Sequence, residues 1–143
     1  MSYPFQSCNL LGALIGALLT PYLYQGAELA QAARAAWELK LAQDWIRWLV
    51  SSAFCGFLVF VAWKANTRAG ERPVLSWFVI VLCVMIFVLA RFEHSIASAY
   101  IMFAAGAYDG QSWLCLLVLI LGNTVGAVIP AAAFREPQDG RET

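Results

Sequence analysis

Three ionisable side chains interrupt an apolar stretch of this sequence. Arg91, Glu93 and His94 lie between two uncharged runs, residues 74–90 and 96–108. An ionisable group at membrane depth costs about 2.5–3.5 kcal/mol on insertion scales, so such groups face protein or water and have partners. A polar break in a hydrophobic segment is also the best sequence indicator of a transporter's substrate site. This interruption is therefore the predicted functional centre of the chain.

His94 is the only histidine in the chain, and its position leaves two interpretations open. In the first, a buried imidazole bonds a backbone carbonyl and holds the interruption together. In the second, His94 meets a small anion, which an imidazole can hydrogen-bond and to which it can pass a proton. Glu93 points about 100° away from His94 if both are helical. We therefore expect Glu93 to accept backbone N–H groups or to pair with Arg91, and we expect Arg91 to neutralise Glu93 rather than to attract anions.

The composition is that of an integral membrane protein. The chain has 143 residues, of which 62% are hydrophobic and 13% are charged, against about a quarter charged in soluble domains. Nine basic and nine acidic residues cancel, which argues against nucleic acid as a partner. The four cysteines, Cys8, Cys55, Cys83 and Cys115, lie in apolar runs without zinc-site spacing or the placement of a disulfide framework. The sequence also lacks a Ser/His/Asp set and a Gly-rich nucleotide loop, so it predicts no enzyme, metal or cofactor.

Hydropathy predicts an all-α membrane protein with a single transmembrane domain. Four spans of roughly 20 residues fit the chain length. They cover approximately 8–24, 45–63, 74–106 and 112–134, with the third broken near 91–98. Residues 27–44 combine strong helix formers with a moderate apolar stripe and five charges. This pattern predicts a short amphipathic helix along the membrane surface, with its charges solvated. The polar tail 135–143 is expected to be loose.

Basic residues predict the orientation of the chain. Lys64, Arg68 and Arg72 lie close together between two predicted spans. Short loops rich in Lys and Arg face the cytoplasm. Loop 64–73 and the C-terminus are therefore predicted to be cytoplasmic.

The first and last predicted spans share a short pattern. The sequence Asn-x-x-Gly-Ala begins at Asn9 and again at Asn123. The two matched helices start three spans apart, so they cross the membrane in opposite directions, as in transporters built from inverted repeats. We therefore expect a partial, aquaporin-like inverted repeat.

These residues resemble the formate/nitrite transporter family, the pentameric channels for small monovalent anions. The most specific element is Phe-Glu-His-Ser-Ile-Ala at 92–97, which the family carries within Gly-Phe-Glu-His-Ser-Ile-Ala-Asn. Residues 122–127, Gly-Asn-Thr-Val-Gly-Ala, are similar to the family's Gly-Asn-x-x-Gly-Gly. Residues 8–13, Cys-Asn-Leu-Leu-Gly-Ala, are similar to its Gly-Asn-x-x-Gly-Ala, and residues 55–63 resemble the end of its fourth helix.

Three positions depart from the family pattern. Arg91 stands where the family has Gly, Ser98 where it has Asn, and Cys55 where its fourth helix has Asn. The first change puts a cation beside the interruption, and the other two remove amides. Family members also have six spans, and this chain aligns with the last four, so the family's first broken helix has no counterpart here.

The resemblance implies a channel or transporter subunit for formate, nitrite or similar weak-acid anions, with or without coupled protons. The implied pore residues are His94, Asn123, Asn9, Ser95, Ser98 and Phe92, and the implied supporting residues are Glu93 and Arg91. The half-helix that starts near Ser98 would direct its N-terminal N–H groups at the anion. The implied setting is a bacterial-type cytoplasmic (inner) membrane, with the chain in a homo-oligomer, a pentamer by resemblance.

A second hypothesis is a truncated, non-conducting family member that acts as a membrane scaffold or as one part of a split transporter. A lone four-span chain would leave a polar groove facing lipid, where unsatisfied polar groups are costly. We therefore expect either further copies of this chain or a partner chain to supply the missing helices.

Overall fold

The computed structural model describes residues 11–19, 26–68 and 73–134, and every regular element in these ranges is a helix. The all-α prediction is therefore confirmed. The helices with defined bounds are α2 (Gly26–Leu41), α3 (Trp45–Thr67), α4 (Pro73–Leu89), α5 (Ser95–Ala105) and α6 (Gly110–Ala133). Residues 11–19 are helical as well.

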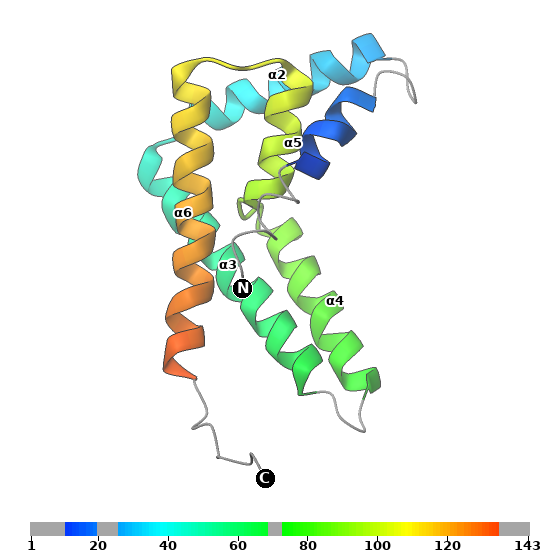
Figure 1. Cartoon of the computed structure of the whole chain (residues 1–143), viewed down its shortest axis with the longest axis vertical. Coiled ribbons are helices and arrows are strands. Elements are labelled where there is room, and N and C mark those ends of the chain that lie inside the picture. The colour runs from blue at the N-terminus through cyan, green and yellow to red at the C-terminus, as the bar shows by residue number, and fades with distance from the viewer. Residues whose placement is uncertain (1–10, 20–25, 69–72, 135–143) are drawn as a thin grey trace.

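The helices form an elongated arrangement with a crossing helix at one end. α3 and α6 lie side by side, and α4 packs on α3 away from α6 (Figure 1). α5 and α4 follow one another along the long axis, and α2 crosses near the outer ends of α5 and α6. The largest of the fully buried side chains lie where α2, α5 and α6 meet: Trp37 is 2% exposed, and Met102 and Leu119 are 0% exposed. The core therefore sits directly beside the interruption between α4 and α5.

Glycines allow α3 and α6 to approach each other closely. A Cβ at Gly126 would collide with the backbone of Ala53, and one at Gly56 would collide with the backbone of Asn123. A Cβ at Gly122 would collide with the Ser52 side chain. Small residues that let helix backbones touch are the usual basis of helix association in membranes. This contact fixes Asn123 against α3.

Two helices have the length and hydropathy of membrane spans. α3 has 23 residues and α6 has 24, and both are apolar enough by composition to cross a bilayer. α4 and α5 are shorter apolar helices of 17 and 11 residues. α4 has no charged residue, and only its Ser76 and Cys83 are buried within the described chain. Its exposed surface is therefore suited to contact with lipid or with other apolar helices.

The α4–α5 interruption lies at residues 90–94, where the backbone leaves the helix. The sequence placed the break near 91–98, but α5 already begins at Ser95, so Ser95 and Ser98 are helical. The expectation that the second half-helix starts near Ser98 was wrong by about one turn. His94 caps the helix at the earlier position by accepting from the Ile96 backbone N–H. The use of this interruption as a pore loop stays a prediction.

α4 and α5 end in the same hydrogen-bonded motif with different residues at its strained position. After α5, Gly106 has φ 67°, and the Gly106 and Ala107 N–H groups donate to carbonyls of the last turn. After α4, Arg91 has φ 52°, and the Arg91 and Phe92 N–H groups donate in the same way. This is the Schellman motif, whose left-handed residue is usually glycine. A side chain there costs roughly 1–2 kcal/mol, so Arg91 is held in a conformation that disfavours it.

Several sequence expectations lie outside the described residues. Asn9, Cys8 and Arg72 fall there, as does the tail 135–143. The predicted inverted repeat pairs Asn9 with Asn123, so it stays a prediction. The domain limits and the four-span count stay predictions as well.

We predict that Gly126→Ala destabilises the protein, because its Cβ would force the α3–α6 backbones apart. The expected loss of unfolding free energy is about 1–3 kcal/mol, measured by thermal unfolding in detergent. The control is Gly110→Ala, whose Cβ would meet nothing within 4 Å and whose helix propensity improves. Equal stability of the two variants would contradict the close contact.

Candidate functional site

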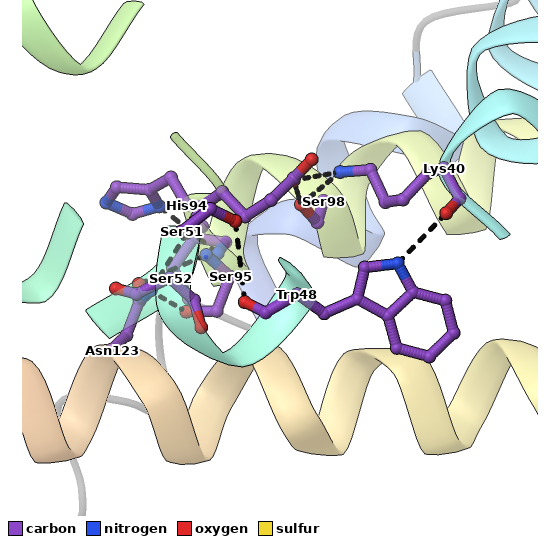
Figure 2. A network of polar contacts seen from close by, with 10 residues as sticks. Lys40, Trp48, Ser51, Ser52, His94, Ser95, Ser98 and Asn123 are labelled. Atoms are coloured by element: carbon purple, nitrogen blue, oxygen red, sulfur yellow. Dashed lines mark hydrogen bonds and ion pairs between the residues drawn. The ribbon is translucent and has the colours of Figure 1, made fainter. Parts of the chain in front are cut away.

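A buried lysine on α2 reaches the α4–α5 interruption. The Lys40 ammonium forms an ion pair with Glu93 and donates to Ser98 Oγ at 2.6 Å. Ser98 Oγ in turn donates to Glu93 Oε2 at 3.1 Å, which closes a triangle of contacts (Figure 2). The side chains of Lys40 and Glu93 are 10% and 14% exposed. Each buried charge is thus compensated by its partner.

This pair corrects two sequence expectations. The charges of the amphipathic helix were expected to be solvated, but Lys40 is buried. Glu93 was expected to pair with Arg91 or with backbone N–H groups, and its carboxylate instead binds Lys40 and Ser98. α2 packs on α5, which places its last turn beside the interruption. Spacing along the chain favoured the neighbour Arg91, but the fold brings the more distant cation to Glu93.

Two tryptophans fix α2 in this position. Trp48 Nε1 donates to the Lys40 carbonyl at 2.9 Å, so α3 satisfies a carbonyl in the last turn of α2. Trp37 Nε1 donates to Ser112 Oγ at 2.8 Å. The Ser112 hydroxyl donates to the carboxylate of Asp109, the N-cap residue of α6. Lys40 is therefore positioned from both of the long helices.

Asn123 satisfies backbone groups on both sides of His94. Its Nδ2 donates to the carbonyls of Ser52 at 2.8 Å and Glu93 at 2.9 Å. Its Oδ1 accepts from the Ser95 N–H and from Ser95 Oγ, both at 3.2 Å. Figure 2 shows this cluster between α3, α5 and α6. Both the oxygen and the nitrogen of the Asn123 amide are therefore engaged.

His94 is half-buried at the end of the interruption. Its Nδ1 accepts from the Ile96 N–H at 3.2 Å, so Nδ1 carries no proton and the neutral ring carries its proton on Nε2. Nε2 has no hydrogen-bond partner among the described residues. The ring lies 5.9 Å from the ring of Phe87, centroid to centroid. The His94 ring therefore presents one N–H donor that no described residue uses.

The two remaining residues of the interruption differ in their contacts. The Phe92 ring stacks on Phe54 of α3 at 5.5 Å between centroids, which agrees with a packing role. Arg91 is exposed, and its guanidinium has no ion pair or hydrogen bond in the part of the chain that the structure describes.

Sequence reasoning left Lys40 out of the candidate site. Lys40 lies three residues after Trp37 and seven after Ala33. This spacing puts it on the same helix face as two buried apolar residues. A lysine on a buried helix face needs a buried anionic partner. The spacing in the sequence could therefore have predicted that Lys40 forms an ion pair. Among the other candidates, Asn9 lies outside the described residues, while Ser95, Ser98 and Asn123 gather around Glu93 and His94.

These features define a helical membrane protein with a polar centre at a broken helix, a class that includes transporters. Comparison with family models narrows the class. The formate/nitrite transporter model matches residues 5–135. The chain therefore belongs to the formate/nitrite transporter family, as the resemblance predicted, and this is a family of transporters rather than enzymes. No curated protein and no solved structure matched in the corresponding comparisons.

We predict that Lys40→Met destabilises the fold because it leaves Glu93 buried without its cation. Removing one partner of a buried pair costs about 3–5 kcal/mol. The double variant Lys40→Met/Glu93→Gln should regain much of that loss, which a double-mutant cycle of unfolding free energies measures. The control is Lys64→Met, which makes the same substitution in the last turn of α3, away from the Lys40–Glu93 pair. A double variant no more stable than Lys40→Met would contradict the pairing.

We predict that the stability contributed by Asp109, the N-cap residue of α6, depends on pH. Hydrogen bonds from the Ser112 side chain and N–H, and from the Gln111 N–H, lower the pKa of Asp109 below its ordinary 3.8. The cap therefore contributes its full stability above pH 3.8 and loses it as the pH falls through the lower folded pKa. Asp109→Asn keeps a capping oxygen that does not titrate. The thermal midpoints of the two proteins should converge below pH 3.8, and a constant difference would contradict the prediction.

Proposed function

We propose that this chain is a subunit of a channel or transporter for small monovalent weak-acid anions, such as formate or nitrite. The observation that carries the proposal is His94, half-buried at a helix interruption with Nδ1 engaged and Nε2–H unengaged within the described chain. The unused N–H donor of the His94 ring fits a small acceptor with one charge. The setting we propose is a bacterial-type cytoplasmic membrane, with loop 64–73 and the C-terminus cytoplasmic.

In this proposal the donor to the anion is the His94 side chain rather than the first turn of α5. The Ser95 N–H already donates to Asn123, and the Ile96 N–H donates to His94. Their capacity to bind an anion is thus taken up. Asn123, Ser95 and Ser98 hold the interruption in shape, and Phe92 packs beside it as a constriction. Asn9 is proposed as a pore residue from the resemblance alone.

The Nδ1 contact bears on how a proton would be handled. Protonating Nδ1 would turn the acceptor for Ile96 into a donor and would break the cap of α5. We therefore propose that His94 works as a neutral donor that holds the anion in place. An anion that picks up a proton from water then crosses the apolar flanks at much lower desolvation cost than its charged form.

The carboxylate of Glu93 would repel an anion if it were alone. The Lys40 ammonium beside it neutralises that charge. In our proposal this pair therefore has a permissive role: it lets an anion approach His94, and it gives the Glu93 backbone a fixed position.

A second candidate function rests on how open the molecule is around α4. α4 packs on α3, and most of its apolar residues are exposed. The family has six spans by resemblance, so a chain with four would complete its pore with helices from further copies or from a partner chain. In this reading the chain is one part of a split transporter or a non-conducting scaffold. A monodisperse monomer that conducts would contradict it.

We predict that His94→Ala abolishes formate and nitrite flux into proteoliposomes, whereas His94→Asn retains a substantial part of it. Asparagine caps a helix well and keeps an N–H donor, but it cannot be protonated. Loss of one hydrogen bond to a charged group corresponds to about tenfold or more in binding. Thr124→Ala, next to Asn123 and exposed, is the control for reconstitution. Equal loss in the Ala and Asn variants would show that proton transfer by His94 is required, and would overturn the neutral-donor proposal.

A further inference from the structure

Arg91 is a cation of this interruption for which the described residues supply no partner. Glu93, two residues away, is taken by Lys40 and Ser98. The Arg91 side chain is exposed and makes no ion pair or hydrogen bond to any residue in the described ranges. Apolar residues surround it in sequence, since 73–90 carries no charge. A guanidinium in such a place is costly unless an anion or water meets it.

The backbone conformation at residue 91 disfavours an arginine side chain, so local structure does not explain why arginine stands there. The residue has φ 52°, at the position of the Schellman motif that glycine occupies in the matching turn after α5. Glycine would relieve the strain of the left-handed conformation there. Strained conformations of this kind gather at functional sites. The side chain is therefore retained against a local energetic preference.

Arg91 also lies within reach of the proposed anion position. His94 follows Arg91 three positions later, so the two Cα atoms are at most roughly 11 Å apart even in an extended chain. A guanidinium offers five N–H donors, stays protonated at any working pH, and binds carboxylate oxygens in pairs. A planar anion with two oxygens, as in formate or nitrite, matches this geometry.

We propose that Arg91 is an anion-binding residue that captures the permeant carboxylate-like anion before it reaches His94. This proposal rests on the proposed function, because it takes the anion for the substrate of the same site. Arg91 determines affinity for the charged form of the substrate, and His94 receives the anion afterwards. Negatively charged substrates should therefore depend on Arg91 more strongly than neutral molecules of the same size.

The test is Arg91→Gly, which the local backbone favours. A purely structural role predicts a more stable protein with unchanged KM for formate. Our proposal predicts a more stable protein whose KM for formate rises about tenfold, the size expected for loss of a hydrogen bond to a charged group. Arg91→Lys, which keeps the charge without the paired donors, should fall between the two. A higher thermal midpoint with unchanged KM would overturn the proposal.

A binding measurement separates this proposal from the proposed function. Sodium formate at increasing concentration should raise the thermal midpoint of the wild-type protein in detergent and raise that of Arg91→Gly much less. If wild type binds formate through Arg91 but carries no flux, the proposed function fails and the anion site stands. Phosphatidylglycerol is the second ligand in the same assay. Stabilisation of wild type by this lipid, with no effect of formate, would identify a headgroup contact and overturn the proposal.

Discussion

A helix that breaks at membrane depth exposes backbone N–H and C=O groups that lipid cannot satisfy. The rest of this structure depends on which groups form hydrogen bonds with the backbone at residues 90–94. The amide of Asn123 accepts the Ser95 N–H and donates to the Glu93 carbonyl, and His94 accepts the Ile96 N–H. Asn123 can do this because glycines let α6 lie directly against α3. The close packing of α3 on α6 thus lowers the free-energy cost of the interruption, because it brings Asn123 to the backbone groups that need partners.

The same segment also carries the charged side chain of Glu93, which forms an ion pair with a residue from another helix. Lys40 arrives from α2, which α5, α6 and Trp48 hold in place. The backbone groups of the interruption therefore find their partner on α6, and the Glu93 carboxylate finds its cation on α2. Among the side-chain N–H groups of the interruption, the His94 Nε2–H and the Arg91 guanidinium have no partner within the described residues. A site is recognised here by the groups that the protein leaves unused within its described residues, rather than by the number of polar groups gathered in it.

Hydropathy predicted the interruption because charges inside an apolar run form a local signal. It did not give the partner of Glu93, since Lys40 lies 53 residues away and α2 resembles a surface helix on its own. The position of Lys40 on the buried face with Trp37 was visible in the sequence, but its partner required the packing of α2 on α5. The strain at Arg91 follows from backbone dihedrals alone. Patterns within one element were thus predictable, whereas contacts between elements were not.

The link between Lys40 and Glu93 has a mechanical consequence. A helix advances 1.5 Å per residue, and a hydrogen bond is lost beyond roughly 3.5 Å. A slide of α2 along its axis by about two residues would therefore withdraw the ammonium from Glu93 and leave a bare carboxylate beside His94. In the proposed function, an anion at that histidine would then lie beside an unpaired carboxylate. The register of α2 at one end of the molecule thus decides whether the Glu93 carboxylate beside His94 has a paired cation.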